Sequence, residues 1–222
     1  MNSHINLFNR DCMEAMKEIE DNQFDLAIVD PPYGLGMGKN LNNNVKVNYK
    51  DKSWDQRPPD QKYFDHLFRV SKNQIIWGGN YFPFLWKNGC KGFICWNKLI
   101  SEKHCNKRAD VEMAWSSFDT TSRYFEYKWD GNIYGFKNNI QGIGQRSTRI
   151  HPTQKPIKLY EWILMNYAKE GDKILDTHLG SGSIAIACHN LGFDLTGFEI
   201  DQEYFSASVK RYQQHKNQLR IF

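Results

Sequence analysis

The sequence predicts an α/β fold, with a mostly parallel sheet of seven strands and helices on both faces. Short strand-like runs that end near turn or breaker residues recur along the chain, and helical patterns separate many of them. This alternation is typical of a parallel sheet that is covered on both sides. The 222 residues and the 40% hydrophobic content suit one folded domain of this kind.

Seven segments carry the strand pattern, and helical patterns follow several of them. The expected strands are residues 5–8, 24–30, 73–77, 92–96, 110–115, 173–177 and 194–200. The expected helices carry the patterns CMEAMKEIE, IKLYEWILMNYAK, SIAIACHNLG and QEYFSASVKRYQQH. Pro156 stands directly before the second of these patterns, which suits a proline in the first turn of a helix.

The chain carries no signal for a membrane or for export. No apolar run approaches the roughly 20 residues that a membrane-spanning helix needs. The opening MNSHINLFNRD does not combine a positive charge with an apolar leader, so no signal peptide is expected. The cysteines are odd in number and scattered, which argues against a disulfide framework. A cytoplasmic protein without a membrane partner is expected.

Zinc is the metal for which the cysteines are candidate ligands. The imaginable ligands are Cys90, Cys95, His104 and Cys105. They lack the paired C-x-x-C spacing of structural zinc sites, so we expect ordinary thiols and no metal.

The charge of the chain is weak evidence for a polyanionic partner. The formal net charge is only +4, from 29 Lys and Arg against 25 Asp and Glu. Residues 87–108 are more basic, because Glu102 is their only acid. The last turns carry Lys210, Arg211, Lys216 and Arg220. Such charge runs are usually solvated faces, and a nucleic-acid contact is the alternative.

Two segments interrupt the alternation of strands and helices. Residues 34–58 are rich in Gly and Asn and are expected to form a mobile loop. Residues 118–150 are polar, with aromatic side chains among Arg and Lys. Neither segment resembles a core element. They are either a lid and a surface excursion, or contacts to a large substrate.

The stretch KILDTHLGSGSIAIACHNLGFDLTGFEID predicts a nucleotide-like ligand. It reads as a strand, a Gly-containing turn, a helix and a second strand that ends in an acid. Gly180, Ser181 and Gly182 allow the backbone to approach a ligand at the helix N-terminus. Glu199 can accept hydrogen bonds from both ribose hydroxyls.

The identity of this ligand depends on Asp176, which ends the strand before the turn. Gly180, Gly182 and Ala185 also satisfy a G-x-G-x-x-A dinucleotide pattern, which is a weak signal alone. A carboxylate at this point would repel a pyrophosphate and attract a cationic amino acid end. Asp176 therefore favours S-adenosyl-L-methionine over NAD, unless it only caps the turn.

The stretch FDLAIVDPPYG ends a buried strand in an unusual way. Asp30, Pro31, Pro32 and Tyr33 form a rigid corner that presents one carboxylate and one ring, and its prolines have no N–H to donate. An isolated Pro-Pro-Tyr is more often a core tyrosine beside a turn. Together with Asp30 and the glycine turn, it indicates a reaction site.

With both segments known, the chain resembles the DNA amino-methyltransferases, which modify the exocyclic nitrogen of adenine or cytosine. In that family a D/N/S-P-P-Y/F corner is catalytic, and an Asp-x-x-x-Gly-x-Gly turn binds S-adenosyl-L-methionine. The matching residues here are Asp30, Pro31, Pro32 and Tyr33 in the corner, and Asp176, Gly180 and Gly182 in the turn. His178 departs from the family pattern, where phenylalanine is common.

The order of the motifs resembles the circularly permuted β group, because the catalytic corner precedes the cofactor turn. The resemblance implies a Rossmann-like S-adenosyl-L-methionine-dependent methyltransferase fold. HPTQKP, with Thr153 and Lys155, resembles the segment that lines the methionine end of the cofactor. Asp11 resembles the acid that approaches its adenine, and Asp30 and Pro31 also face the cofactor.

The resemblance also implies how one domain, residues 1–222, is divided. Residues 1–117 form the catalytic half, residues 118–150 a target-recognition insertion and residues 151–222 the cofactor half. DNA contacts are expected from the basic stretch, the loop after Tyr33 and the insertion. The small insertion leaves little protein to encircle a duplex, so a homodimer is expected.

The expected reaction is methyl transfer to N6 of an adenine flipped out of double-stranded DNA. Hydrogen bonds accepted by Asp30 and by the Pro31 carbonyl would localise the lone pair of the target amine. Tyr33 would stack on the extruded base. Aspartate in the corner resembles the adenine enzymes. The alternatives are N4-cytosine methylation, an inactive DNA-binding relative and an NAD oxidoreductase.

Overall fold

The structure is a computed structural model that describes most of the chain. The described residues are 3–36, 57–87, 89–99, 109–129, 134–136, 139–141 and 150–218. Most of the loop expected at 34–58, and the second half of the basic stretch at 87–108, lie outside them.

The core of the molecule is one sheet of eight strands. In spatial order the strands are β1 (Ile5–Asn9), β11 (Asp194–Glu199), β10 (Lys173–Asp176), β2 (Phe24–Val29), β3 (Ser71–Trp77), β5 (Val111–Ser116), β4 (Phe93–Asn97) and β6 (Arg123–Glu126). β5 pairs antiparallel with both of its neighbours, and the other pairings are parallel. All seven predicted strands are present, which confirms the predicted fold class.

The eighth strand, β6, corrects the expectation that residues 118–150 contain no core element. Phe125 in β6 and Tyr127 just after it are buried in the larger of two apolar clusters. The indole N–H of Trp96 donates to the Tyr127 carbonyl across 3.0 Å. The polar and aromatic composition of the segment concealed these two core side chains.

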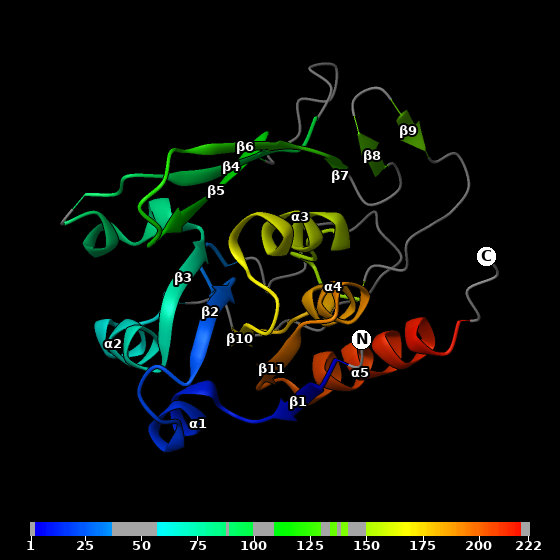
Figure 1. The fold of residues 1–222 in the computed structure, drawn as a ribbon, viewed down its shortest axis with the longest axis horizontal. Helices are drawn as coiled ribbons and strands as arrows, with labels where there is room; N and C mark the ends of the chain where they lie inside the picture. The colour runs from blue at the N-terminus through cyan, green and yellow to red at the C-terminus, as the bar shows by residue number, and fades with distance from the viewer. Residues whose placement is uncertain are drawn as a thin grey trace.

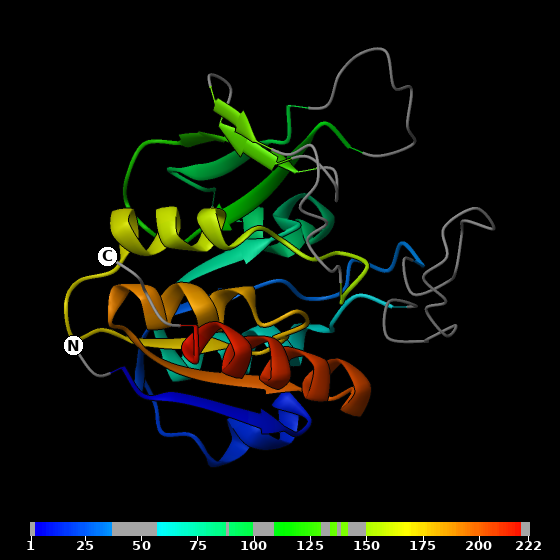
Figure 2. The same ribbon diagram turned by 90° about the vertical axis from the view of Figure 1, so that its right-hand side faces the viewer.

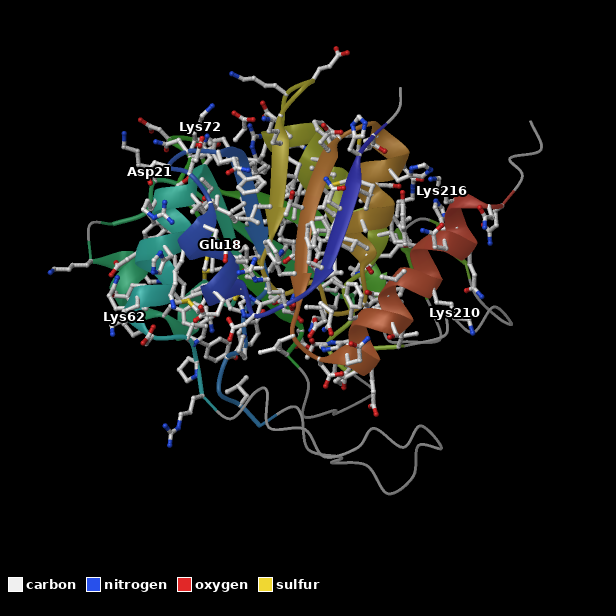
Figure 3. All side chains as sticks on the ribbon, turned by 90° about the horizontal axis from the view of Figure 1, so that it is seen from below. Glu18, Asp21, Lys62, Lys72, Lys210 and Lys216 are labelled. Carbon is white, nitrogen blue, oxygen red and sulfur yellow. The ribbon has the colours of Figure 1, made fainter. Side chains whose placement is uncertain are left out.

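Helices cover both faces of the sheet (Figure 1). The helices are α1 (Cys12–Glu18), α2 (Gln61–Val70), α3 (Ile157–Tyr167), α4 (Ser183–Leu191) and α5 (Gln202–Lys216). Helices α1 and α2 enclose one apolar cluster, and α3, α4 and α5 enclose the other. Figure 3 shows β1, β11 and β10 between these layers, with Lys62 of α2 and Lys210 of α5 pointing outward. None of the described helices combines the length and the apolar character that crossing a bilayer requires.

Short elements complete the fold. Two 3₁₀ helices, η2 (Gly79–Tyr81) and η3 (Pro83–Trp86), follow β3. A separate three-stranded sheet contains β7 (Lys128–Trp129), β8 (Tyr134–Phe136) and β9 (Asn139–Gln141). This small sheet lies beyond the β6 side of the molecule (Figure 2).

Helix α2 was not predicted, although the sequence carries its signals. Asp60 caps it by accepting a hydrogen bond from the Tyr63 N–H at 3.2 Å. Its buried residues are Tyr63, Phe64, Leu67 and Val70, which recur at the spacing of one helical face. The helix is the crossover that allows β2 and β3 to pair in parallel.

The connections leave the middle of the sheet in opposite directions. From β10 the chain passes through α4 to β11 on one side, and from β2 it passes through α2 to β3 on the other. Since β10 and β2 are neighbours, their carboxyl ends open at a topological switch point. Ligands of such sheets bind at this position.

Candidate functional site

The predicted corner and the predicted glycine turn lie on the same edge of the sheet. Asp30 follows β2 and Asp176 ends β10, and Leu175 is in register with Ala27. Burial raises the pKa of Asp176, and the hydrogen bond from the His178 N–H partly opposes this effect. The charge of Asp30 raises the pKa further, so the two carboxyl groups interact. Asp30 and Asp176, which are 146 positions apart in the sequence, therefore meet at the switch point.

Both oxygens of the Asp30 carboxylate have partners. The Tyr33 hydroxyl donates to Oδ1 across 2.5 Å. The Lys155 ammonium lies 2.5 Å from Oδ2. The side chains of Asp30 and Lys155 are only 16% and 3% exposed, so this ion pair is largely shielded from solvent. Lys155, expected at the cofactor, thus contacts Asp30 of the Asp-Pro-Pro-Tyr corner.

Glu112 is the second carboxylate of this corner. Its Oε2 lies 3.2 Å from the Lys155 Nζ, and its Oε1 pairs with Lys98. Glu112 lies near the start of β5, which runs antiparallel to β3. The start of β5 therefore meets the carboxyl ends of the parallel strands.

Burial and charge set the protonation states of the corner. Burial lowers the pKa of Lys155, but the carboxylates of Asp30 and Glu112 outweigh it and raise the pKa. Burial also raises the pKa of Asp30, which Lys155 partly opposes. The pKa of Tyr33 is well above its usual value because of burial and the Asp30 charge, so its hydroxyl stays protonated and donates.

Glycine at position 78 allows the Tyr33 ring to occupy its place. Gly78 has a φ of +68°, and a Cβ there would lie 2.1 Å from Cε1 of Tyr33. The Tyr33 ring stacks on Tyr81, with centroids 5.0 Å apart and planes inclined by 20°. The edge of Phe82 meets it at a centroid distance of 6.3 Å.

The cofactor turn is tied to the end of β11 through Glu199. Gly180 donates its N–H to Oε2 of Glu199 across 2.8 Å, and Asp201 donates its N–H to Oε1 across 2.9 Å. Gly180 and Gly182 have φ values of +50° and +68°, which side-chain-bearing residues rarely adopt. Ser181 is buried, and its hydroxyl lies 3.1 Å from that of Ser183.

Asp176 is a buried carboxylate that suits a cationic ligand. It is 2% exposed and accepts the His178 N–H at 3.0 Å. No cationic side chain of the described residues forms an ion pair with it. Burial raises its pKa to about 8. A positively charged group would stabilise the ionised form.

A cavity of about 180 Å³ opens beside the turn. Its lining residues are Arg10, Asp11, Cys12, Thr177, His178, Glu199 and Ile200. Asp11, which was expected near the cofactor adenine, caps α1 through the Met13 N–H and shares the cavity with Glu199. The residues that the cavity brings together suit a nucleoside.

His178 forms one wall of the cavity at the position where the family commonly has phenylalanine. Burial lowers its pKa to about 4, so the imidazole is neutral near pH 7. The Thr177 hydroxyl lies 2.9 Å from its Nδ1 and 2.6 Å from the Tyr63 hydroxyl. The wall is therefore a neutral ring with a hydrogen-bonded edge.

The segment 151–156 is attached to the cofactor turn. Ser183, at the start of α4, donates its hydroxyl to the Lys155 carbonyl across 2.8 Å. The Thr153 hydroxyl lies 3.1 Å from Nδ1 of His151. A Cβ on Gly180 would lie 3.6 Å from the same ring nitrogen. His151 thus lies between Thr153 and the turn.

Two basic side chains expected in solvated or DNA-binding runs have internal roles instead. Arg211 donates to the Ser181 carbonyl and to the Ser183 hydroxyl at 2.8 and 2.9 Å. Lys98 pairs with Glu112 in the corner. Residues 100–108, 137–138 and 142–149, which carry other basic candidates, lie outside the described residues.

Cys12, Cys90, Cys95 and Cys188 are free thiols. The described residues contain no group of side chains that could hold a metal ion. Cys105 and His104, two of the imaginable zinc ligands, lie outside them.

Sequence reasoning missed Glu112, Tyr63 and Lys98 as parts of the site. Glu112 carried a signal, since it is an acid within the otherwise apolar run VEMAW. Tyr63 was missed together with α2. Nothing in the local sequence distinguishes Lys98 from the other lysines of its stretch.

Comparison with known proteins identifies the family. Residues 80–210 match the family described as DNA methylase, which is more than half of the chain. The chain belongs to this family. It is a DNA amino-methyltransferase of the β-group type, and S-adenosyl-L-methionine is the methyl donor of the family.

Two relatives of this DNA methylase match it over most of its length. Type II methyltransferase M.HpaI from Haemophilus parainfluenzae is 25% identical over 237 residues, which cover 90% of this chain and 71% of the relative. Type II methyltransferase M2.MboI from Moraxella bovis is 25% identical over 239 residues, which cover 94% and 88% of the two chains.

Solved structures share the fold of this DNA methylase. The M1.HpyAVI–SAM complex has a TM-score of 0.58 at 23% identity, and the match covers 93% of this chain and 99% of the other. The cytosine-N4-specific PvuII DNA methyltransferase has a TM-score of 0.63 at 12% identity, covering 98% and 92%.

Proposed function

We propose that the protein is a site-specific DNA methyltransferase that modifies N6 of adenine in double-stranded DNA. The observation that supports this most directly is the meeting of Asp30 and Tyr33 with the Asp176 turn at one switch point. The first position of the Asp-Pro-Pro-Tyr corner is aspartate, which is typical of the adenine enzymes.

Residues of four segments would hold the cofactor. Glu199 would accept the ribose hydroxyls, and Asp176 would balance the ammonium end. Asp11 would accept from the adenine amine, across the cavity that it shares with Glu199. Thr153 would line the methionine end. When bound, S-adenosyl-L-methionine supplies an electrophilic methyl group on a positively charged sulfur.

Asp30 and the Pro31 carbonyl would accept the two N–H groups of the target amine. These hydrogen bonds localise the nitrogen lone pair and aim it, which the base alone cannot do because its ring delocalises that pair. The locked φ of Pro31 and Pro32 fixes the direction of the acceptors. A strong general base is unnecessary, because the methylated amine becomes acidic as its positive charge develops.

Tyr33 would receive the extruded base. A base in a duplex is inaccessible to a methyl donor, so it must leave the stack at a cost of a few kcal/mol. Stacking on an aromatic ring returns about 1–3 kcal/mol. Tyr33 already stacks on Tyr81 and is oriented by its hydrogen bond to Asp30.

Target recognition would come from residues 118–150, within the division into residues 1–117, 118–150 and 151–222. The small sheet of β7, β8 and β9 belongs to this segment. Two copies would share the duplex as a homodimer, and sedimentation of the protein with and without DNA tests this. The Type II relatives support a role in restriction–modification, in the cytoplasm where the DNA lies.

The test is expression in a methylation-deficient host, followed by single-molecule sequencing of its DNA. We expect N6-methyladenine at one recurring sequence. Asp30→Ala should abolish the mark, while Asp65→Ala, which changes an exposed aspartate of α2, should preserve it. N4-methylcytosine would replace the adenine assignment, and an unmodified genome would favour an inactive DNA-binding relative.

A further inference from the structure

The charges at the catalytic corner alternate along a chain of four side chains. Lys155 lies between Asp30 and Glu112, and Lys98 pairs with the far oxygen of Glu112. Lys98 contacts Glu112 but forms no ion pair with Asp30 among the described residues. The four charges sum to zero, with the negative Asp30 at one end of the chain and the positive Lys98 at the other.

The surroundings of Lys155 strengthen these interactions. Its ammonium is 5.2 Å from the centroid of the Trp77 ring and 5.9 Å from that of Tyr33. Trp77 is fully buried, and the Lys155 side chain is 3% exposed. Charges act over longer distances in such surroundings, because little water screens them.

A lysine alone on Asp30 would oppose the expected chemistry. The corner must stabilise positive charge, both on the methyl donor and on the amine as it is methylated. An Asp30–Lys155 pair without a further carboxylate would be neutral, and its field on a nearby cation would be weak. Glu112 offsets Lys155, so the Asp30 end of the chain stays negative and the balancing charge of Lys98 lies at the far end.

We propose that Glu112 is a positioning residue that holds Lys155 between two carboxylates, so that Asp30 stays fixed in orientation and its end of the charge chain remains negative. This inference rests on the proposed function, because it assumes that a cationic methyl donor faces Asp30. It assigns Glu112 no contact with substrate. Glu112 acts through Lys155, which carries the effect to Oδ2 of Asp30.

The structure also distinguishes the two oxygens of Asp30. Lys155 forms an ion pair with Oδ2, while Oδ1 accepts a hydrogen bond from the Tyr33 hydroxyl. We therefore assign Oδ1, whose partner is a neutral hydroxyl, as the oxygen that accepts from an incoming amine. Loss of Glu112 would let the ammonium move further onto Asp30.

Two ligands without a transferable methyl group test the proposal in binding experiments. S-adenosylhomocysteine is neutral at sulfur, whereas sinefungin carries an ammonium at the position of the methylsulfonium. The ratio of their affinities, measured by titration calorimetry, reports the charge that the corner presents. A general loss of structure would weaken both ligands and leave the ratio unchanged.

We expect the wild type to prefer sinefungin, and Glu112→Gln to reduce this preference about tenfold, on the scale of one charge acting across a partly buried site. Glu161→Gln is the matched control, because Glu161 is a buried glutamate paired with Lys158 in α3. It should leave the ratio unchanged. An unchanged ratio in Glu112→Gln would overturn the proposal.

A second substitution tests whether Glu112 acts through Lys155. In Glu112→Gln with Lys155→Met, the negative charge of Glu112 and the positive charge of Lys155 are both absent. Loss of Lys155 raises the pKa of Asp30 further above its usual value, because burial then acts unopposed by that lysine. The two affinities are therefore compared over a rising pH series, and the ratio should recover once Asp30 is ionised. Persistence of the reduced ratio would contradict action through Lys155. Glu112→Asp keeps the charge and guards against misfolding of the glutamine variant; a ratio as low as that of glutamine would also overturn the proposal.

Methyl transfer separates this inference from the proposed function. With saturating DNA and cofactor, Glu112→Gln should slow single-turnover methylation about tenfold or more, as expected when one stabilising charge is lost from a transition state. If the wild type shows the affinity ratio but transfers no methyl group, the proposed function fails and the positioning role stands.

Discussion

The Asp176 carboxyl group is buried beside the glycine turn, and burial raises its pKa to about 8. It is therefore mostly protonated in the free protein at pH 7. A ligand ammonium would favour the carboxylate, so the complex would hold fewer protons than the free protein. Linkage then requires affinity to rise with pH up to about 8 and binding to release a proton.

We expect S-adenosylhomocysteine to bind up to about tenfold more tightly per pH unit between pH 6 and 8, the limit for one proton. Titration calorimetry in buffers with different ionisation enthalpies will count the released protons. Asp176→Asn should bind more weakly and remove the pH dependence. Proton release that persists in this variant would place the titrating group elsewhere.

Gly78 is the residue that makes room for the Tyr33 ring. We expect Gly78→Ala to displace this ring from Asp30, because the new Cβ would lie 2.1 Å from Cε1 of Tyr33. Overpacking of this kind costs about 1–3 kcal/mol. Gly171→Ala is the matched control, because Gly171 also has a left-handed backbone, with a φ of +88°, but nothing lies within 4 Å of the new Cβ.

Urea unfolding and methyl transfer of both alanine variants separate strain from the clash. Both should lose about 1–2 kcal/mol from the left-handed backbone. Only Gly78→Ala should lose more stability and most of its methyl transfer. Equal behaviour of the two variants would mean that the ring position does not matter.

At the scale of elements, β6 shows how a strand in a polar segment becomes part of the core. It pairs in parallel with β4, and Phe125 packs on Trp162 of α3 with ring centroids 5.2 Å apart. Its neighbour Tyr124 is 56% exposed. The strand therefore has one side chain in the core and one at the surface.

We expect Phe125→Ala to lower the free energy of unfolding by about 3–5 kcal/mol, the usual cost of removing a buried phenylalanine ring. Tyr124→Ala should change it by only about 0.5 kcal/mol, as for a surface site. Denaturant unfolding monitored by circular dichroism provides both values. A small effect of Phe125→Ala would mean that β6 contributes little to the stability of the core.

At the scale of the whole molecule, the site is built where the connections of β10 and β2 diverge. α2 follows β2 on one face and α4 follows β10 on the other, so neither helix covers the edge. Asp30 at the end of β2 and Asp176 at the end of β10 can then interact with one ligand. The position of the proposed site is thus a consequence of the strand order.

The proposed mechanism uses carboxylates, a lysine and a tyrosine, and no metal. Dialysis against EDTA should therefore leave methyl transfer and the unfolding temperature unchanged. Elemental analysis of the purified protein measures its metal content directly. Stoichiometric zinc would contradict it and would draw attention to Cys105 and His104.

The sequence by itself determined seven of the eight strands of the main sheet, the Asp-Pro-Pro-Tyr corner and the glycine turn. These features depend on neighbouring residues: apolar runs, prolines with a fixed φ, and glycines at left-handed positions. Local sequence also determined helix α2, because Asp60 is a helix-capping residue and the apolar residues that follow it share one helical face. The sequence therefore contains the signals for α2, although the helix was not predicted.

Only the tertiary structure decided the partners of these features. Glu112 meets Lys155 because β5 runs antiparallel to its neighbours and returns an acid to the carboxyl edge of the sheet. Phe125 is buried because β6 finds a place beside β4. Strand order and direction arise from packing over the whole chain, and no local periodicity encodes them.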